Sequence, residues 1–415
     1  MLSRNILFFF ALFWMTAMQA QGKYTIVVAG YDWGPAVSKV IIGLDKAVAQ
    51  VDKDDFNVTA ERSVEGDILE TDGRQVIFAY PSNVRGERVD KGSFVTLVLQ
   101  IGPDESIASP FHFMEGRNRW IDYHLDVYQA STDQHWTEEA GRMMPQVERF
   151  DLTGRFDYQG KFTLPYASFI PENEMGKRPL IIWLHGGGEG GNDPTIPLLA
   201  NLATNYAAPE IQDYFDGAFV LVPQCPGAWM HNAAGISTWG KENDIYNEGL
   251  MALIKDYVAQ HPTIDTDRIY VGGCSNGGYM SLKLLMLYPD YFAAAFPSAS
   301  AYKSEYLTDE ALTTIKDIPI WLIHAKDDPV TEAEDTAIPT YERLMALGAK
   351  DVHLSLFDHV VDVTGFFGGD NYYYLGHFSW VYSHKNLCRL DYDGKPVLHQ
   401  GKPVTLMEWL AAQER

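Results

Sequence analysis

Residues 269–278 read Ile-Tyr-Val-Gly-Gly-Cys-Ser-Asn-Gly-Gly, and the rest of the chain is organised around them. Three apolar residues lead into a glycine-rich turn, and residues 279–287 follow with apolar side chains at helical spacing. The turn contains Gly-x-Ser-x-Gly, in which Gly273 and Gly277 flank Ser275. Glycines at these positions let the backbone turn sharply and leave the serine hydroxyl exposed. The stretch therefore predicts a strand, a tight turn that presents Ser275, and a helix.

Chance occurrences of the same five-residue pattern are common in flexible turns, so its context decides its meaning. Here a strand precedes the turn and a helix follows it, as an exposed nucleophile requires. The backbone N–H of Asn276 would lie at the start of that helix, where it can face a developing oxyanion. We therefore interpret Ser275 as a nucleophile and Asn276 as an oxyanion donor.

The composition indicates a globular protein of two domains. The chain has 415 residues, of which 46% are hydrophobic and 21% are charged, and this length exceeds one ordinary domain. The formal net charge is −23 and the pI is near 4.8. Because no large basic surface is available, we expect no nucleic-acid partner. We attribute the acidity to the solubility that a large net charge confers on a protein.

The first 20 residues have the order of a secretory signal peptide. Arg4 supplies a positive charge, residues 6–15 are almost wholly apolar, and small or polar residues lead to Ala20. The apolar run is short for a membrane span, so we expect a secreted or periplasmic protein without stable membrane insertion after cleavage. The alternative is an uncleaved anchor.

The three cysteines are an odd number for an exported protein. At least one thiol is therefore free or bonded to another chain. Cys225 ends a predicted strand and Cys274 precedes the nucleophile, so these two could form a disulfide. Three buried thiols that act as small apolar residues are the alternative.

Residues 21–150 predict an Ig-like β-sandwich domain. Strand candidates cover residues 24–28, 76–80 and 94–101, and residues 121–128 alternate between apolar and polar side chains. Such alternation is typical of a half-buried strand, and proline and glycine mark the turns between the strands. No set of nucleophile, base and acid occurs in this part of the chain.

Residues 151–415 predict an α/β domain. Residues 179–184 form a continuous apolar strand, as expected for a strand that is buried on both faces. Further strands are predicted at 162–170, 219–222, 292–296, 318–323 and 352–357, with helices at 244–260 and 341–347. Strands that alternate with helices indicate a mostly parallel sheet with helices on both faces. Side chains at the carboxyl ends of the strands then meet at one edge.

The acid and the base that a nucleophilic serine needs should follow Ser275 in the chain. Asp327 and Asp328 come just after the strand at 318–323, and we favour Asp328 because the Asp-Pro-Val turn follows it directly. Asp327 remains the alternative. Candidates for the base follow the last strand: His359, His377, His384 and His399. We favour His377, which Gly376 precedes, and keep His359 as the alternative.

The second oxyanion donor is predicted in the loop His185-Gly-Gly-Gly-Glu-Gly-Gly191. Glycines allow backbone N–H groups to converge on one point, so Gly187 or Gly188 would act together with Asn276. A phosphate-binding loop is not indicated, because Lys-Ser or Lys-Thr does not follow the glycines. Neither a metal nor an organic cofactor is expected.

Several of these motifs, taken in order, resemble one enzyme family. They are the glycine loop, Val-Pro-Gln-Cys-Pro at 222–226, the elbow at 272–279, Asp-Asp-Pro-Val at 327–330 and Gly-His-Phe-Ser-Trp at 376–380. Residues 160–415 resemble the α/β-hydrolase serine esterases near the prolyl oligopeptidase and polyhydroxybutyrate-depolymerase-like enzymes. The resemblance implies Ser275, His377 and Asp328 as the triad. Residues 22–150 resemble the Ig-like domain that some secreted esterases carry.

The sequence thus predicts an exported serine carboxylesterase that cleaves short-chain or aryl esters, with a small-molecule or polysaccharide-linked ester as substrate. A serine peptidase of the prolyl oligopeptidase type and a non-catalytic binding module for carbohydrate or protein are the alternatives. Residues 361–374 contain two aromatic clusters around a Gly-Gly pair. Since long loops near a site often bind substrate, we expect Phe366, Phe367, Tyr372, Tyr373 or Tyr374 to line the substrate pocket.

Overall fold

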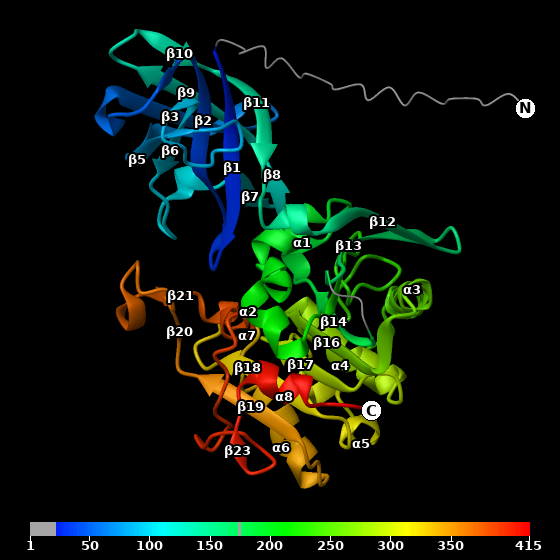
Figure 1. Ribbon diagram of the computed structural model, residues 1–415. Helices are drawn as coiled ribbons and strands as arrows, with labels where there is room; N and C mark the ends of the chain where they lie inside the picture. Colours follow the sequence, from blue (N-terminus) through cyan, green and yellow to red (C-terminus); the bar gives the residue numbers. More distant parts are fainter. Residues whose placement is uncertain (1–21, 173–175) are drawn as a thin grey trace, which may run out of the picture.

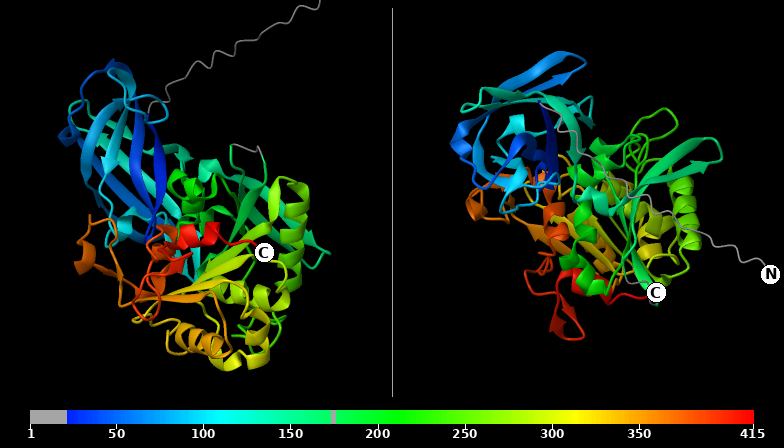
Figure 2. Two further views of the ribbon diagram at one scale, coloured as in Figure 1. Left: turned by 60° about the horizontal axis from the view of Figure 1, so that its bottom comes forward. Right: turned by 45° about the horizontal axis from the view of Figure 1, so that its top comes forward.

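The computed structural model describes residues 22–172 and 176–415 (Figure 1). The predicted signal peptide at residues 1–20 lies outside this part. A β-sandwich forms the N-terminal domain, and a mixed sheet with helices on both faces forms the C-terminal domain (Figures 1 and 2). The predicted fold class, an α/β-hydrolase sheet preceded by an Ig-like sandwich, is confirmed.

Two sheets pack face to face in the sandwich, with strand orders β11-β1-β2-β6-β5 and β10-β9-β3-β4. The side chains of Tyr24, Tyr123 and Trp136 fill the space between them and are almost fully buried. Strand β9 alternates buried and exposed residues over most of its length, as its sequence predicts. The strands are β1 (Lys23–Tyr31), β2 (Gly34–Val48), β3 (Phe56–Val64), β4 (Asp67–Arg74), β5 (Val76–Ser82), β6 (Gly92–Leu99), β9 (Asp122–Gln129), β10 (Gln134–Trp136) and β11 (Glu138–Met143).

The sheet of the C-terminal domain has eight strands in the order β12-β13-β15-β14-β16-β17-β18-β19. The strands from β15 to β19 in this order are parallel, and β12 and β13 add an antiparallel edge. The central strands are buried on both faces, which explains their continuous apolar sequences. The strands are β12 (Asp151–Tyr158), β13 (Phe162–Phe169), β14 (Arg178–Leu184), β15 (Phe219–Pro223), β16 (Ile264–Cys274), β17 (Ala294–Ser298), β18 (Ile320–Ala325) and β19 (Val352–Phe357).

Helices cover both faces of this sheet, and an apolar core lies on each face. One core continues into the sandwich, so the two domains share buried apolar residues. At their junction a Cβ on Gly30 would lie 2.8 Å from the side chain of Leu202. The helices are α1 (Thr195–Ala200), α2 (Pro209–Gln212), α3 (Asn247–Gln260), α4 (Asn276–Leu287), α5 (Asp309–Ile315), α6 (Ala337–Ala346), α7 (Trp380–His384) and α8 (Leu406–Ala411). Within the described residues, no helix is long and apolar enough to span a membrane.

Two segments cross between the domains. The hairpin of β7 (Phe111–Met114) and β8 (Arg117–Trp120) reaches from the sandwich to the C-terminal domain. In the other direction, the segment with β20 (Val360–Val361) and β21 (Tyr373–Tyr374) extends beneath the sandwich (Figures 1 and 2). An ion pair between the buried Asp32 and the partly exposed Lys385, 3.1 Å apart, adds to the contact.

All three cysteines are buried and free. Of the two possibilities that the sequence left open, a Cys225–Cys274 disulfide and three buried thiols, the structure has the second. The Sγ of Cys274 donates to Oδ1 of Asn201 at 3.3 Å, so this thiol packs behind the elbow as a small side chain. Burial raises the pKa of Cys225 and Cys274 above the usual value of a thiol, which makes them poor nucleophiles.

His353 on β19 holds the C-terminal segment against the sheet. Its ring nitrogens lie 2.7 Å from Asp391 and 3.0 Å from Asp351. Burial alone would lower the pKa of His353, but the two carboxylates outweigh it and raise the pKa to about 9. The charged imidazole therefore stabilises the fold fully below pH about 6.5, its unfolded pKa, and this contribution is lost as the pH rises through 9.

We expect the loss of this charge to lower the free energy of unfolding by on the order of 2–3 kcal/mol, and with it the melting temperature by about 2–5 °C, between pH 6.5 and 9.5. A His353→Gln variant lacks the titration and should show a flatter dependence over the same interval. Thermal unfolding of both proteins in matched buffers gives the comparison. Parallel curves for the two proteins would contradict the assigned role of His353.

Candidate active site

Ser275 lies in the sharp turn between β16 and α4, as the sequence predicts. Its backbone has φ 54° and ψ −111°, a strained conformation for a residue with a side chain. The glycines around it are required by space, because a Cβ on Gly277 would lie 1.9 Å from the carbonyl oxygen of Leu184. The turn thus holds the Ser275 side chain at the carboxyl edge of the sheet, facing a cavity.

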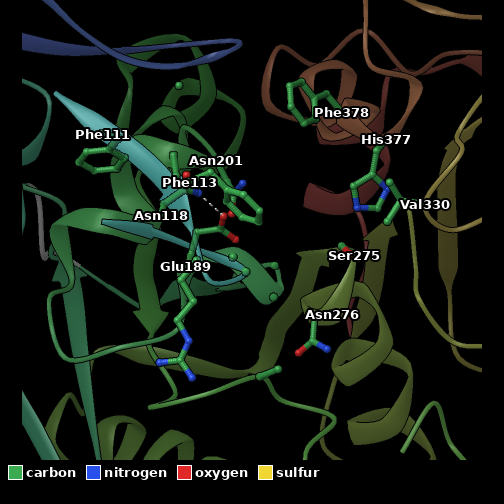
Figure 3. Close-up of a pocket in the computed structure, with 18 of the residues that line it drawn as sticks. Phe111, Phe113, Asn118, Glu189, Asn201, Ser275, Asn276, Val330, His377 and Phe378 are labelled. Carbon is green, nitrogen blue, oxygen red and sulfur yellow. Dashed lines mark hydrogen bonds between the residues drawn. The ribbon is translucent and has the colours of Figure 1, made fainter. Parts of the chain in front are cut away.

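His377 and Asp328 reach the same place from the loops after β19 and β18. Nδ1 of His377 and Oδ2 of Asp328 are 2.8 Å apart, and the imidazole ring lies above Ser275 (Figure 3). Both side chains are buried. The structure therefore brings together the three residues that the sequence analysis favoured.

Asp328 is held by an extensive set of donors. Its Oδ1 accepts from the backbone N–H groups of Val330 and Thr331, and its Oδ2 accepts from the Thr331 hydroxyl. Nε2 of His324 lies 3.2 Å from Oδ2. Burial would raise the pKa of Asp328, but the hydrogen bonds from His324 and His377 outweigh it and lower the pKa well below the usual range. The carboxylate therefore stays charged at any ordinary pH.

The alternative acid and base form a different pair. Oδ2 of Asp327 lies 2.8 Å from Nδ1 of His359, and this pair is exposed to solvent. His384 is buried against Trp183, with ring centroids 4.6 Å apart, and His399 lies on the outer strand β22 (Leu398–His399). None of these four residues lines the cavity in front of Ser275.

The glycine loop after β14 forms a short 3-10 turn, Gly187–Glu189. A Cβ on Gly187 would lie 4.0 Å from the Cβ of Asn276, so the loop and the start of α4 are neighbours. The ring of His185 fixes the base of the loop, since Nδ1 contacts the carbonyl of Gly186 at 2.6 Å and Nε2 accepts from the N–H of Cys225. Burial lowers the pKa of His185 to about 4, so the ring is neutral.

The cavity has a volume of about 1080 Å³ and is lined by both domains. Ser275 and His377 form one part of its wall, and the glycine loop continues it toward the β7–β8 hairpin. Phe111 and Phe113 of the β7–β8 hairpin lie on the opposite side, as Figure 3 shows. Further aromatic rings come from residues 33, 239, 378 and 380.

The expectation that the aromatic residues of 361–374 line this cavity is wrong. Phe367 packs edge-on against Trp33 of the sandwich, with ring centroids 4.9 Å apart, and the Tyr372 hydroxyl donates to Asp104 at 3.0 Å. Tyr374 packs on Trp33, Tyr373 stacks on His359, and Phe366 is 86% exposed. Phe367, Tyr372 and Tyr374 thus attach the loop to the N-terminal domain, through partners that the sequence did not reveal.

Sequence reasoning missed several residues of the site. The only signal for His324 was its place four residues before Asp328. Glu189 was visible as the one charged residue of the glycine loop, and nothing local marked Asn118 as its partner. Within residues 22–172 and 176–415, no group of three or more His, Cys, Asp or Glu side chains is placed to hold a metal ion.

Comparison with known proteins agrees with this architecture. Residues 23–139 match the family model described as the esterase Ig-like N-terminal domain, and residues 166–360 match the phospholipase/carboxylesterase family model. A thermostable esterase of known structure superposes with a TM-score of 0.73 at 23% identity, over 94% of this chain and 99% of that one. This likeness shows the fold.

Feruloyl esterase B of Neurospora crassa is 27% identical over 132 residues, which are 31% of this chain and 40% of that protein. The match thus spans less than half the length of the relative. The two family models identify the chain as an α/β-hydrolase of the carboxylic ester hydrolase class. Within that class it is similar to esterases that carry an Ig-like N-terminal domain.

Proposed function

We propose that this protein is an exported serine carboxylesterase that cleaves short-chain or aryl esters through Ser275, His377 and Asp328. The observation that carries the proposal is the arrangement of Ser275 below the ring of His377, whose Nδ1 lies 2.8 Å from the buried carboxylate of Asp328. Export rests on the order of residues 1–20 and is tested by the mass of the mature chain, which should begin after Ala20.

In the proposed reaction, Oγ of Ser275 attacks the ester carbonyl carbon while Nε2 of His377 accepts the hydroxyl proton. The backbone N–H of Asn276 and that of Gly187 or Gly188 stabilise the oxyanion of the tetrahedral intermediate. The intermediate collapses to an acyl-enzyme, and the alcohol leaves with the proton from His377. Water then repeats the sequence on the acyl group and releases the acid. Asp328 keeps the proton of His377 on Nδ1 throughout.

Aromatic rings on the wall opposite Ser275 support an aryl or short acyl substrate. Phe113 is 62% exposed inside the cavity, where a substrate can cover it. A Cβ on Gly188 would lie 3.2 Å from the Phe113 ring, so the ring borders the proposed oxyanion donors. The similarity to a feruloyl esterase points to the same substrate class.

Hydrolysis of a panel of esters, from p-nitrophenyl acetate to p-nitrophenyl laurate and including methyl cinnamates, tests the proposal. We expect the highest kcat/KM for acetyl or cinnamoyl esters and the lowest for laurate. A folded protein that hydrolyses none of them would overturn the esterase assignment. Faster cleavage of peptide amides than of esters would favour the peptidase alternative.

Phe113→Ala should lower kcat/KM for the cinnamate relative to the acetate by roughly two- to tenfold, the worth of one aromatic contact. Phe366→Ala is the matched control, because it removes an equally large and more exposed ring that lies outside the cavity. The control should keep the wild-type ranking of substrates. A changed ranking in Phe366→Ala, with none in Phe113→Ala, would place the substrate elsewhere.

A further inference from the structure

Glu189 is a buried carboxyl group that the proposed reaction does not use. It ends the turn Gly187–Glu189, which carries the proposed oxyanion donors, and it is only 5% exposed. Burial of a carboxyl group is costly unless its oxygens receive hydrogen bonds. The partners of Glu189 therefore indicate what this residue does.

One carboxyl oxygen of Glu189 is bound by the N-terminal domain, and the other lies against the glycine loop. Oε1 accepts from Nδ2 of Asn118 at 2.9 Å, drawn as a dashed line in Figure 3. Burial raises the pKa of Glu189 to about 7, and the backbone N–H of Gly186 beside the carboxyl group opposes this rise. A Cβ on Gly186 would lie 2.8 Å from Oε2, so only glycine permits this close return of the side chain. Glu189 thus closes the glycine loop upon itself.

The backbone of Glu189 is fixed as well. Its carbonyl accepts from Nε2 of the buried Gln224 at 2.8 Å, and two residues later Gly191 donates to the carbonyl of Cys225. The glycine loop is therefore attached to the end of β15 on one side. On the other side it depends on Asn118, which belongs to the N-terminal domain.

Asn118 lies on β8 of the hairpin that leaves the sandwich. Its neighbours also bind the C-terminal domain, since Arg117 donates to the carbonyl of Pro226 at 3.0 Å and Trp120 donates to Thr195 at 2.9 Å. These contacts dock the hairpin at sites beside the glycine loop. Of these three hydrogen bonds, only the one that Asn118 donates is to a side chain of the glycine loop.

We propose that the hydrogen bond between Asn118 and Glu189 is an interdomain strut that positions the oxyanion donors of Gly187 and Gly188. The strut makes the Ig-like domain part of the catalytic apparatus, and Asn118 and Glu189 are positioning residues. This inference rests on the proposed esterase function. Since backbone donors act only when they are held in place before the reaction, loss of the strut should lower kcat more than it raises KM.

Exchange of the two polar groups tests the strut without changing the net charge. Asn118→Asp alone removes the amide donor and sets a second carboxyl group against Glu189, whose pKa burial raises to about 7. Assayed at pH 9, above that pKa, this variant should lower kcat for p-nitrophenyl acetate by roughly 10- to 100-fold, within the cost of losing one oxyanion donor. In the double variant Asn118→Asp/Glu189→Gln, the side-chain amide of residue 189 donates to the carboxylate of residue 118, so the hydrogen bond is kept with its direction reversed. The double variant should recover to within about fivefold of wild-type kcat.

Asn118→Ala provides a second variant that adds no charge, in case Asn118→Asp does not fold. It should also lower kcat, leave KM within about threefold, and weaken inhibition by a phenylboronic acid, which forms a tetrahedral adduct. Tyr372→Phe is the matched control, because it removes a single interdomain hydrogen bond, to Asp104, far from the glycine loop. The control should keep wild-type kcat.

An equal loss of kcat in Asn118→Ala and Tyr372→Phe would overturn the strut, because the effect would then reflect domain docking in general. Failure of the double variant to recover, with a melting temperature equal to that of the wild type, would also overturn it. These outcomes require an active wild-type enzyme. An inactive wild type that a fluorophosphonate does not label would instead refute the esterase function itself.

Discussion

Replacement of Ser275 by Ala should lower kcat for ester hydrolysis by roughly 10⁴- to 10⁶-fold, the usual loss for the nucleophile of a triad. The reason is chemical, because alanine lacks the oxygen that forms the acyl-enzyme. The strained backbone at φ 54° belongs to the turn and is needed with either side chain. The fold should therefore survive the change, and the melting temperature should stay within a few degrees of wild type.

Labelling by a fluorophosphonate measures the same hydroxyl directly. The wild type should gain the mass of one phosphonyl group, and Ser275→Ala should gain none. Ser281→Ala is a suitable control, since the Ser281 hydroxyl donates to the carbonyl of Gly277 one turn along α4 and lies outside the cavity. Near-wild-type turnover in Ser275→Ala would remove the proposed mechanism altogether.

The elbow could be predicted from the sequence because its causes are local. The glycines of the turn are required by contacts with adjacent strands, and the strand and helix beside it have clear apolar patterns. The glycine loop was recognisable for the same reason. The parallel sheet followed from alternating strands and helices, whose carboxyl ends must share one edge. The position of the site could therefore be predicted from local sequence patterns.

Features that depend on the docking of two domains could not be predicted. Phe113 and Asn118 reach the cavity from more than 150 residues before Ser275, and no local pattern marks where their hairpin docks. The aromatic residues of 361–374 failed as pocket residues for the same reason. Phe367 and Tyr374 pack instead on Trp33 of the sandwich, a contact that only the packed structure shows.

The sequence favoured Asp328 over Asp327 but left Asp327 open as the alternative. Neighbouring residues in a turn differ mainly in the direction of their side chains, and the structure turns Asp328 inward and Asp327 outward. Four donors besides His377 surround Asp328: two backbone N–H groups, the Thr331 hydroxyl and the ring of His324. These hydrogen bonds hold the carboxylate in one orientation, as is required of the partner of a catalytic base.

Asp328→Asn should therefore lower kcat by roughly 10⁴-fold, because an amide cannot hold the proton of His377 on Nδ1 and leave Nε2 free to accept one. The new NH₂ group also faces donors, so the variant should melt several degrees lower, at a cost of about 1–3 kcal/mol for each unmatched buried group. Assays well below that melting temperature, normalised to folded protein by circular dichroism, separate the two effects.

Asp327→Asn is the matched control, with the same chemical change one residue earlier. Its carboxylate pairs with His359 at the surface, where an ion pair contributes about 0–1 kcal/mol, so kcat should stay within about twofold and the melting temperature should hardly move. The loss of kcat in Asp328→Asn divided by the loss of kcat in Asp327→Asn decides between the two aspartates. If Asp327→Asn were the more damaging variant, the base would have to be His359, and the pocket in front of Ser275 would have to rearrange during catalysis to bring that exposed pair to the serine.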